Sequence, residues 1–218
     1  MSKLVVVITG ASSGNGRATA RRFARNGAAV VLVARDKAAL EETAQECVSL
    51  GGMPLPLVAD MGDHAAVSQA GSEAVNRFGH IDVWVNCAAI LHFGRIEDTP
   101  PEIIEQVLRT NVLGYFNGAR VAIEHFRERG TGTLINISSV LAVTAQPYAA
   151  AYVASKAAIR AMSDALRQEV ADMPRIHVCT VLPFAIDTPI YQRAANYSGR
   201  LLQPVLPRYS AEPVADAV

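Results

Sequence analysis

The chain has 218 residues, which fits one large domain with a substantial buried core. Its 20 lysine and arginine residues balance 20 aspartate and glutamate residues, so it lacks the basic field that binds nucleic acid or an anionic membrane surface. Its apolar runs are far shorter than the roughly 20 residues of a membrane-spanning helix, and the N-terminal run is too short for a secretory leader. Three scattered cysteines without CxxC spacing predict neither disulfides nor a metal site, so we expect a cytoplasmic protein.

Short β-rich runs alternate with helical patterns in the first half of the chain. A strand over 3–10 leads through a glycine-rich turn into a helix over 16–27, which the pair Asn26-Gly27 is expected to end. The pattern continues with a strand over 28–35, a helix over 36–52, a strand over 54–60 and a helix over 64–79.

The second half repeats this alternation. It predicts a strand over 81–86, a helical stretch over 99–130, a strand over 132–138, a helix over 151–172 and a strand over 176–183. We expect Thr99 to cap the long helical stretch, with prolines in its first turn and Glu102 at the capping-box position. Continuous apolar strands separated by helices predict a parallel sheet covered on both faces, which is a doubly wound Rossmann-type α/β fold.

We assign residues 1–218 to one dinucleotide-binding and catalytic domain. After Pro183 the pattern loosens, and we expect the segment of about 184–210 to bind substrate. The chain then stops within the start of a helix at "AEPVADAV", so the C-terminal strand of the sheet is expected to be missing.

The stretch "TGASSGNG", residues 9–16, joins the first strand to the first helix. Its glycines permit positive φ and close approach of the backbone to a ligand, and the following helix directs its amides and positive dipole end to the same place. A glycine-rich turn without a ligand is the alternative, but the position directly after the first strand favours a nucleotide site. The loop residues that we assign to it are Gly10, Ser12, Ser13, Gly14, Asn15 and Gly16.

The end of the second strand predicts which dinucleotide is bound. An acid about 20 residues after the loop is typical of NAD sites, whereas this chain has Ala34 and Arg35 there. Arg35 can fork onto a 2′-phosphate, and Ala34 leaves room for it. We therefore expect NADP(H) in preference to NAD(H); the alternative is that Arg35 is solvated and paired with Asp36.

The stretch "AYVASKAAIR" places Tyr152 and Lys156 one turn apart on one helix face. Ser139 follows the fifth strand at its carboxyl end, where open α/β sheets bind ligands. The glycine loop TGxxxGxG, Asn111 in "NVLG", Ser139 in "NISS" and the YxxxK pair together resemble the short-chain dehydrogenase/reductase family, over about residues 3–189. An isolated YxxxK is commonly a surface pair, but the ordered combination is highly specific.

The chemistry of the pair can be argued from charge. A phenol titrates near pH 10, so a tyrosine acting as a base near pH 7 needs a shift of about 3 units, or about 4 kcal/mol. One cation about 5 Å away supplies about 3 kcal/mol at an effective dielectric of 20. We therefore expect Lys156, with the cationic oxidised nicotinamide, to lower the pKa of Tyr152. In the reductive direction Tyr152 would protonate the developing alkoxide, and Ser139 would hydrogen-bond the same oxygen.

The resemblance implies further roles. Lys156 would bind the nicotinamide ribose, and Asn111 would hold a water between Lys156 and solvent. Asp60 would meet the adenine amino group beside the amide of Met61, and Thr188 would lie near the carboxamide. Capping of a following helix is the alternative for both Asp60 and Thr188. The other cofactor positions implied are Asn86, Ala88, Pro183 and Ile186.

Several residues depart from the family pattern. Asn15 replaces an isoleucine, which should keep the turn but remove an apolar contact. "NNAG" reads "NCAA", so Cys87 and Ala89 should narrow the space near the adenosine ribose; Cys87 is then a buried filler or a reactive thiol. "PG" reads "PF", and Phe184 is expected to line the substrate pocket. The family's last helix and seventh strand do not follow, so either the chain is a fragment or the sheet edge is completed otherwise.

These observations predict an NADP(H)-dependent oxidoreductase that interconverts a ketone or aldehyde and an alcohol. The substrate is expected to be a small, fairly apolar molecule, and no metal is expected. A cofactor-binding scaffold or sensor without catalysis and a lyase or epimerase are the alternatives. The resemblance implies homo-dimers or tetramers formed through the two long helices that follow Thr110 and Tyr152.

Overall fold

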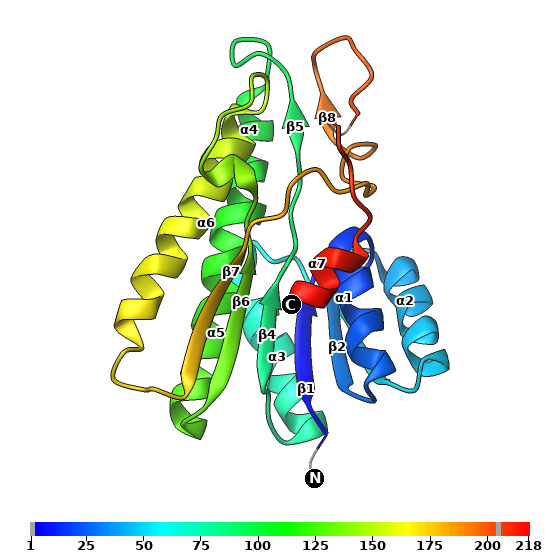
Figure 1. The fold of residues 1–218 in the computed structure, drawn as a ribbon, viewed down its shortest axis with the longest axis vertical. Coiled ribbons are helices and arrows are strands. Elements are labelled where there is room, and N and C mark those ends of the chain that lie inside the picture. The colour runs from blue at the N-terminus through cyan, green and yellow to red at the C-terminus, as the bar shows by residue number, and fades with distance from the viewer. Residues whose placement is uncertain (1–2, 204–205) are drawn as a thin grey trace.

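The computed structural model describes residues 3–203 and 206–218. Its main sheet contains β1 (Val5–Thr9), β2 (Ala29–Ala34), β3 (Met53–Val58), β4 (Val83–Asn86), β6 (Gly132–Ile137) and β7 (Ile176–Val181). All of these strands are parallel, in the order β3-β2-β1-β4-β6-β7 (Figure 1). The direction of strand order reverses between β1 and β4, which is the switch point where doubly wound sheets open a crevice. The predicted fold class is confirmed.

Helices cover both faces of this sheet. They are α1 (Gly14–Arg25), α2 (Lys37–Ser49), α3 (His64–Phe78), α4 (Pro101–Leu108), α5 (Gly114–Arg129), α6 (Ala150–Glu169) and α7 (Glu212–Ala217). Strand side chains alternate between the faces, so Val6 and Ile8 pack against α1 and α2, whereas Val7 faces α3 and α5. None of the helices in the described ranges is long and apolar enough to cross a membrane.

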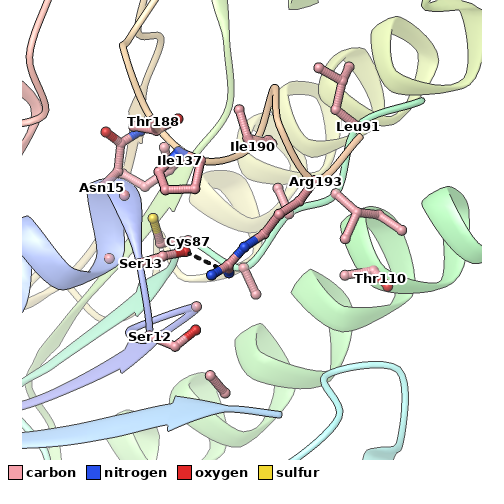
Figure 2. A pocket seen from close by; sticks show the side chains of 18 of the residues that line it. Ser12, Ser13, Asn15, Cys87, Leu91, Thr110, Ile137, Thr188, Ile190 and Arg193 are labelled. Carbon is pink, nitrogen blue, oxygen red and sulfur yellow. Dashed lines mark hydrogen bonds between the residues drawn. The ribbon is translucent and has the colours of Figure 1, made fainter. Parts of the chain in front are cut away.

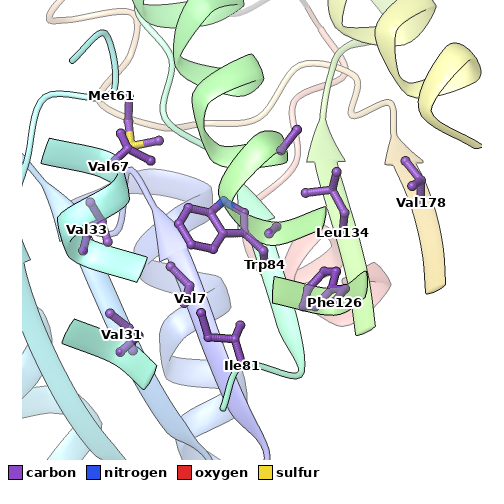
Figure 3. Packing of buried hydrophobic residues seen from close by; sticks show 14 of the residues in the cluster. Val7, Val31, Val33, Met61, Val67, Ile81, Trp84, Phe126, Leu134 and Val178 are labelled. Carbon is purple, nitrogen blue, oxygen red and sulfur yellow. The ribbon is translucent and has the colours of Figure 1, made fainter. Parts of the chain in front are cut away.

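The core on the α3 and α5 face surrounds one large aromatic side chain. Trp84 of β4 is fully buried and packs in one cluster with Val67 of α3 and Phe126 of α5 (Figure 3). Burial of a side chain of this size contributes on the order of 3 kcal/mol. This cluster holds β4 and β6 in place, and both strands end at the site described below.

Local signals in the sequence predict some helix ends correctly and others wrongly. Asn26 is the C-cap of α1 and Gly27 has a φ of 74°, so the predicted stop is confirmed. The predicted cap at Thr99 is wrong, because its hydroxyl donates to the Arg95 carbonyl at 2.8 Å and Pro100 is the N-cap of α4. The expected continuous helix is also interrupted by a π-helical turn, η1 (Arg109–Leu113), between α4 and α5.

The chain beyond β7 packs over the carboxyl ends of the strands. The short strand β8 (Ala195–Asn196) pairs with β5 (His92–Phe93), a two-stranded parallel sheet that the sequence did not predict. Helix α7 begins where the sequence predicts a helix and packs on α1, with Arg22 and Asp216 paired at 2.6 Å. Residues 204–205 of the expected substrate segment lie outside the described residues.

Candidate active site

A cavity of about 490 Å³ lies at the carboxyl ends of the parallel strands (Figure 2). The structure brings most of the residues expected from the sequence to this one cavity. Those that line it are Gly10, Ser12, Ser13, Gly14, Asn15, Gly16, Arg35, Asp60, Met61, Ala88, Ser139, Tyr152, Lys156, Pro183, Ile186 and Thr188. Asn86 and Asn111 do not line it.

The glycine-rich loop is folded tightly against the β4 end. Gly10 has a φ of 69°, and a Cβ on it would lie 2.7 Å from the Cα of Ala88. A Cβ on Gly16 would lie 2.3 Å from the Gly10 carbonyl oxygen, so no side chain fits there. The first amides of α1 have no intrahelical partner and face the cavity end of the loop, and α1 has no acid in its first turn. This backbone cradle fits the pyrophosphate of a dinucleotide.

Asn15 was expected only to remove an apolar contact from the loop. In the structure it also introduces a polar group. Its Oδ1 atom is buried and has no hydrogen-bond partner in the structure. A buried acceptor without a donor is unfavourable in the protein alone, and a pyrophosphate, which carries only acceptors, would not satisfy it.

The opposite end of the cavity bears the residues expected to read the adenosine. Arg35 is exposed, and no ion pair joins it to Asp36 within the described ranges, since the Asp36 carboxylate accepts from the Ala39 amide and caps α2. The alternative of an Arg35–Asp36 pair is therefore wrong. Asp60 accepts from the Gly62 amide at 2.9 Å, and the cap of α3 is Asp63, so the capping alternative for Asp60 is wrong as well.

Ser139, Tyr152 and Lys156 meet at the end of β6. Ser139 is buried, and its Oγ accepts from the Leu141 amide at 3.1 Å, which leaves the hydroxyl hydrogen free to donate. The Lys156 Nζ donates to the Ile137 carbonyl at 2.9 Å and lies 5.5 Å from the centre of the Tyr152 ring. Strand β6 and helix α6 thus hold the three side chains at one wall of the cavity.

Ser138 points away from this wall, as the alternation along an extended strand predicts. Its hydroxyl donates to the Lys156 carbonyl at 2.8 Å and ties β6 to α6. This bond occupies the only hydrogen of Ser138, so Ser139 is the serine available to a ligand.

Burial controls the charges of these groups. It lowers the pKa of Lys156 to about 8, so the ammonium is still mostly charged at neutral pH. Burial is also the largest cause that raises the pKa of Tyr152 well above 10, with neighbouring Tyr191 and Cys87 acting in the same direction and Ser139 in the opposite one. The expected lowering by Lys156 is therefore not found in the protein alone, because loss of hydration dominates.

Two asparagines that were assigned to the site from the sequence use their side chains in hydrogen bonds with other parts of the protein. The Asn111 amide donates to the Ile90 carbonyl and to Ser155 Oγ, both at 3.0 Å, and its Oδ1 accepts from the Ile90 amide. It thereby clasps the chain after β4 to η1 and α6. Asn86 is fully buried and donates to the Tyr115 carbonyl and to Asn136. The side chains of both contact protein rather than the cavity.

The segment after β7 forms the remaining wall. Thr188 is buried beside Gly14, and the residues after it form turns, so the alternative of Thr188 as a helix N-cap is wrong. Phe184 lines the cavity as expected. Cys87 also lines it, and burial raises the pKa of its thiol to about 11, which favours the filler over the reactive thiol.

Sequence reasoning missed other residues of the cavity wall. Ile90, Leu91, Thr110, Ile190 and Arg193 all line it. They belong to no motif: Ile90 and Leu91 precede β5, Thr110 lies in η1, and Ile190 and Arg193 lie in the segment 184–210 that was expected as a whole to bind substrate. Only the accumulation of apolar residues after Pro183 could have indicated some of them.

Comparisons with known proteins test the fold and the family resemblance. The model of the short chain dehydrogenase family matches residues 4–197. An uncharacterized oxidoreductase of Bacillus subtilis is 35% identical over 219 residues, which cover 98% of this chain and 61% of that relative. This chain therefore spans less than two thirds of the length of that relative.

Solved structures are similar over almost the whole chain. An alcohol dehydrogenase from Thermococcus sibiricus, complexed with 5-hydroxy-NADP, has a TM-score of 0.85 at 28% identity. The alignment covers 99% of this chain and 88% of the dehydrogenase chain. A 3-ketoacyl-(acyl-carrier-protein) reductase from Brucella melitensis, complexed with NADH, has a TM-score of 0.86 at 33% identity, covering 99% and 89%. With the family model matched over most of the sequence, this chain belongs to the short-chain dehydrogenase/reductase family.

Proposed function

We propose that the protein is an NADP(H)-dependent oxidoreductase that interconverts a ketone or aldehyde and an alcohol. The observation that supports this most is that Ser139, Tyr152 and Lys156 line the same cavity as the glycine-rich loop. A protein that only held a nucleotide would need the loop, but not a buried phenol, a free hydroxyl hydrogen and a buried ammonium beside it.

In this proposal the protein groups act on the carbonyl oxygen of the substrate. The bound nicotinamide supplies the hydride to the carbonyl carbon. Ser139 donates a hydrogen bond to the carbonyl oxygen and orients it, and the Tyr152 hydroxyl gives its proton to that oxygen as negative charge develops there. The product is the alcohol, and the Tyr152 phenolate that remains is stabilised by the Lys156 ammonium, whose charge lies 5.5 Å from the ring centre.

The raised pKa of Tyr152 suits the reductive direction. The phenol keeps its proton at neutral pH, so the group is ready to act as an acid. Oxidation of an alcohol would need the phenolate, which the Lys156 ammonium 5.5 Å from the ring centre would stabilise.

Arg35 supports a preference for NADP(H). It lines the adenosine end of the cavity, is exposed, and has no acidic partner in the parts of the chain that the structure describes. The two similar structures described above carry an NADP analogue in one case and NADH in the other, so the preference depends on this chain's own residues. A guanidinium without a partner suits the 2′-phosphate that distinguishes NADPH from NADH.

The cavity wall supports a fairly apolar substrate. Leu91, Phe184 and Ile190 line it beyond the reacting groups.

Exposed apolar side chains on another surface, Leu113 and Phe116 near the start of α5, support self-association through α5 and α6. Light scattering of the wild type and of Phe116→Glu tests this, because only the variant should be monomeric.

A paired titration tests the proposed function first. Purified protein is titrated with NADPH and NADH while nicotinamide fluorescence is followed, and NADPH is expected to bind at least tenfold more tightly. Arg35→Gln should remove this difference without abolishing NADH binding. Equal binding of both cofactors by the wild type would overturn the NADP preference and leave the oxidoreductase proposal intact.

The variant Tyr152→Phe tests the chemistry. We expect turnover of carbonyl substrates to fall at least a thousandfold, because the proton donor is lost, while cofactor affinity changes by less than about threefold. Retained turnover would contradict the role of Tyr152. Failure of the wild type to bind either cofactor would contradict the proposed function as a whole.

A further inference from the structure

Arg193 reaches across the cavity from the segment that follows β7. Its amide donates to the Pro189 carbonyl at 3.0 Å, within the turns after Thr188. Its side chain extends toward the glycine-rich loop, where Nη1 lies 3.4 Å from the Oγ of Ser13 (Figure 2). The two residues are 180 positions apart in the chain, and their contact closes one side of the cavity.

This guanidinium is exposed and lies at the N-terminal, positive end of α1. Ser13 is the N-cap residue of α1, the first turn of α1 contains no acid, and the Ser13 hydroxyl makes no capping bond to the helix. Within the described ranges Arg193 forms no ion pair. A cation facing the positive end of a helix without an intervening anion is unfavourable, and an anion placed between them would be attracted by both.

The other charged residues of the cavity do not supply that anion. Asp36 caps α2 and Asp60 accepts from the Gly62 amide, so both carboxylates are engaged at the adenosine end. Lys156 is a cation, and it donates to the Ile137 carbonyl. Among the basic residues that line the cavity, Arg193 is therefore the one that contacts the glycine-rich loop.

We infer that Arg193 binds the pyrophosphate of the dinucleotide and thereby ties the segment 189–194 to the glycine-rich loop. This inference rests on the proposed function of the cavity. The amides at the start of α1 would contact the pyrophosphate from one side, and the planar guanidinium would donate to its oxygens from the other. The cofactor then leaves only after Arg193 has released it, so the arginine acts mainly on the rate of cofactor dissociation.

The test compares Arg193→Gln and Arg193→Lys with the wild type. Dissociation constants are measured for both NADPH and NADH by nicotinamide fluorescence, and dissociation rates by stopped-flow displacement. Arg25→Gln is the matched control, because the substitution removes the same charge. Arg25 is exposed at the opposite end of α1 and does not line the cavity.

We expect Arg193→Gln to weaken NADPH and NADH equally, by about tenfold, mostly through faster dissociation, since both cofactors carry the pyrophosphate. Arg193→Lys keeps the charge but loses the planar fork, so its affinity for both cofactors should lie between those of the wild type and Arg193→Gln. Arg25→Gln should bind both cofactors as tightly as the wild type. As a second readout, hydrogen exchange in residues 189–194 should slow when NADPH binds the wild type and stay fast in Arg193→Gln.

Other results would overturn the inference. Unchanged affinity in Arg193→Gln, with tight binding by the wild type, would contradict it and leave the proposed function standing. A loss confined to NADPH would show that Arg193 contacts the 2′-phosphate instead of the pyrophosphate. If the wild type bound neither cofactor, both the inference and the proposed function would fail.

Discussion

Two groups of polar side chains, one in the core beside β4 and β6 and one at the cavity, differ in how many of their hydrogen bonds are satisfied. The first group joins β4 and β6 to the helices. Trp84 donates to Asn86 at 2.9 Å, Asn86 donates to Asn136 at 3.0 Å, and Asn136 donates to Ser163 at 2.9 Å. Ser163 donates in turn to the Ile159 carbonyl, so the chain of bonds is closed inside the protein.

The second group lines the cavity and is not closed. Among the described residues, the Asn15 Oδ1 atom has no partner, the Lys156 ammonium uses one of its three hydrogens, and the exposed Arg193 meets the glycine-rich loop without an acid. Both groups contain buried polar atoms. The comparison teaches that burial alone does not identify a ligand site, whereas unused hydrogen-bonding capacity next to a cavity does.

Removing a member of the closed group should have the largest effect on stability. Asn136→Ala leaves an Asn86 amide hydrogen and the Ser163 oxygen without partners, and we expect the free energy of unfolding to fall by about 4 kcal/mol. Urea unfolding measures this loss. Asn76→Ala, at an exposed position of α3, is the control and should change stability by less than about 0.5 kcal/mol. Weakened NADPH binding by folded Asn136→Ala would break the comparison, because Asn136 would then act on the site.

The contribution of Lys156 to the free energy of unfolding is expected to depend on pH, and this distinguishes it from the side chains of the closed group. Its pKa is about 8 in the folded protein and near 10.5 when unfolded, so between these pH values the unfolded chain binds more protons. The contribution of Lys156 to the free energy of unfolding therefore rises with pH in this window, by up to about 3 kcal/mol.

Urea unfolding of the wild type and Lys156→Met at pH 7.5 and pH 10 tests this. The difference between the two proteins should shift in favour of the wild type at the higher pH. Burial raises the pKa of Cys47 and Cys87 to about 11, so their contributions fall above pH 9. The Cys47 contribution is the same in both proteins and cancels, but the charge of Lys156 acts on the pKa of Cys87, so both proteins are compared in a Cys87→Ala background. A difference independent of pH would show that Lys156 is not desolvated.

Ser138 and Ser139 allow the same comparison between neighbouring residues, because the hydroxyl hydrogen of Ser138 is bonded within the protein and that of Ser139 is available. Ser139→Ala removes a hydroxyl with a free hydrogen, and we expect turnover to fall about a hundredfold, equivalent to about 2.7 kcal/mol. Ser138→Ala removes a hydroxyl that is bonded to the Lys156 carbonyl, so it should lower the free energy of unfolding by about 1 kcal/mol and turnover by less than tenfold. Steady-state kinetics and thermal unfolding of both variants would reveal any reversal of these effects.

The smallest expected effect is a gain in stability. Asn15→Leu replaces a side chain whose buried Oδ1 atom has no partner among the described residues by an apolar one of similar size, and we expect the free energy of unfolding to rise by about 1 kcal/mol. Chemical unfolding without cofactor measures it. A loss of stability would show that the Asn15 amide is satisfied in solution, and that it belongs with the closed group.

The sequence predicted the order of strands and helices because their signals are local. The periodicity of 2 or 3.6 residues and stops such as Asn26-Gly27 depend on neighbouring residues only. The destinations of Asn86 and Asn111 could not be predicted, because their partners come from other elements. The pKa of Tyr152 depends on how deeply the folded chain buries it, and the contact between Arg193 and Ser13 joins distant parts of the chain. The predicted cap at Thr99 was wrong for a different reason, because its hydroxyl donates to a local acceptor, the carbonyl of Arg95.

Trp84 is the only tryptophan of the chain, and it lies wholly within the closed group. Its indole emission therefore reports on a single place, the contact of β4 with α3 and α5. The native spectrum should be blue-shifted and should move to longer wavelengths only when this core opens to water. Variants at the cavity, such as Tyr152→Phe, should keep the native emission maximum, so one optical signal distinguishes loss of function from loss of folding without any added label.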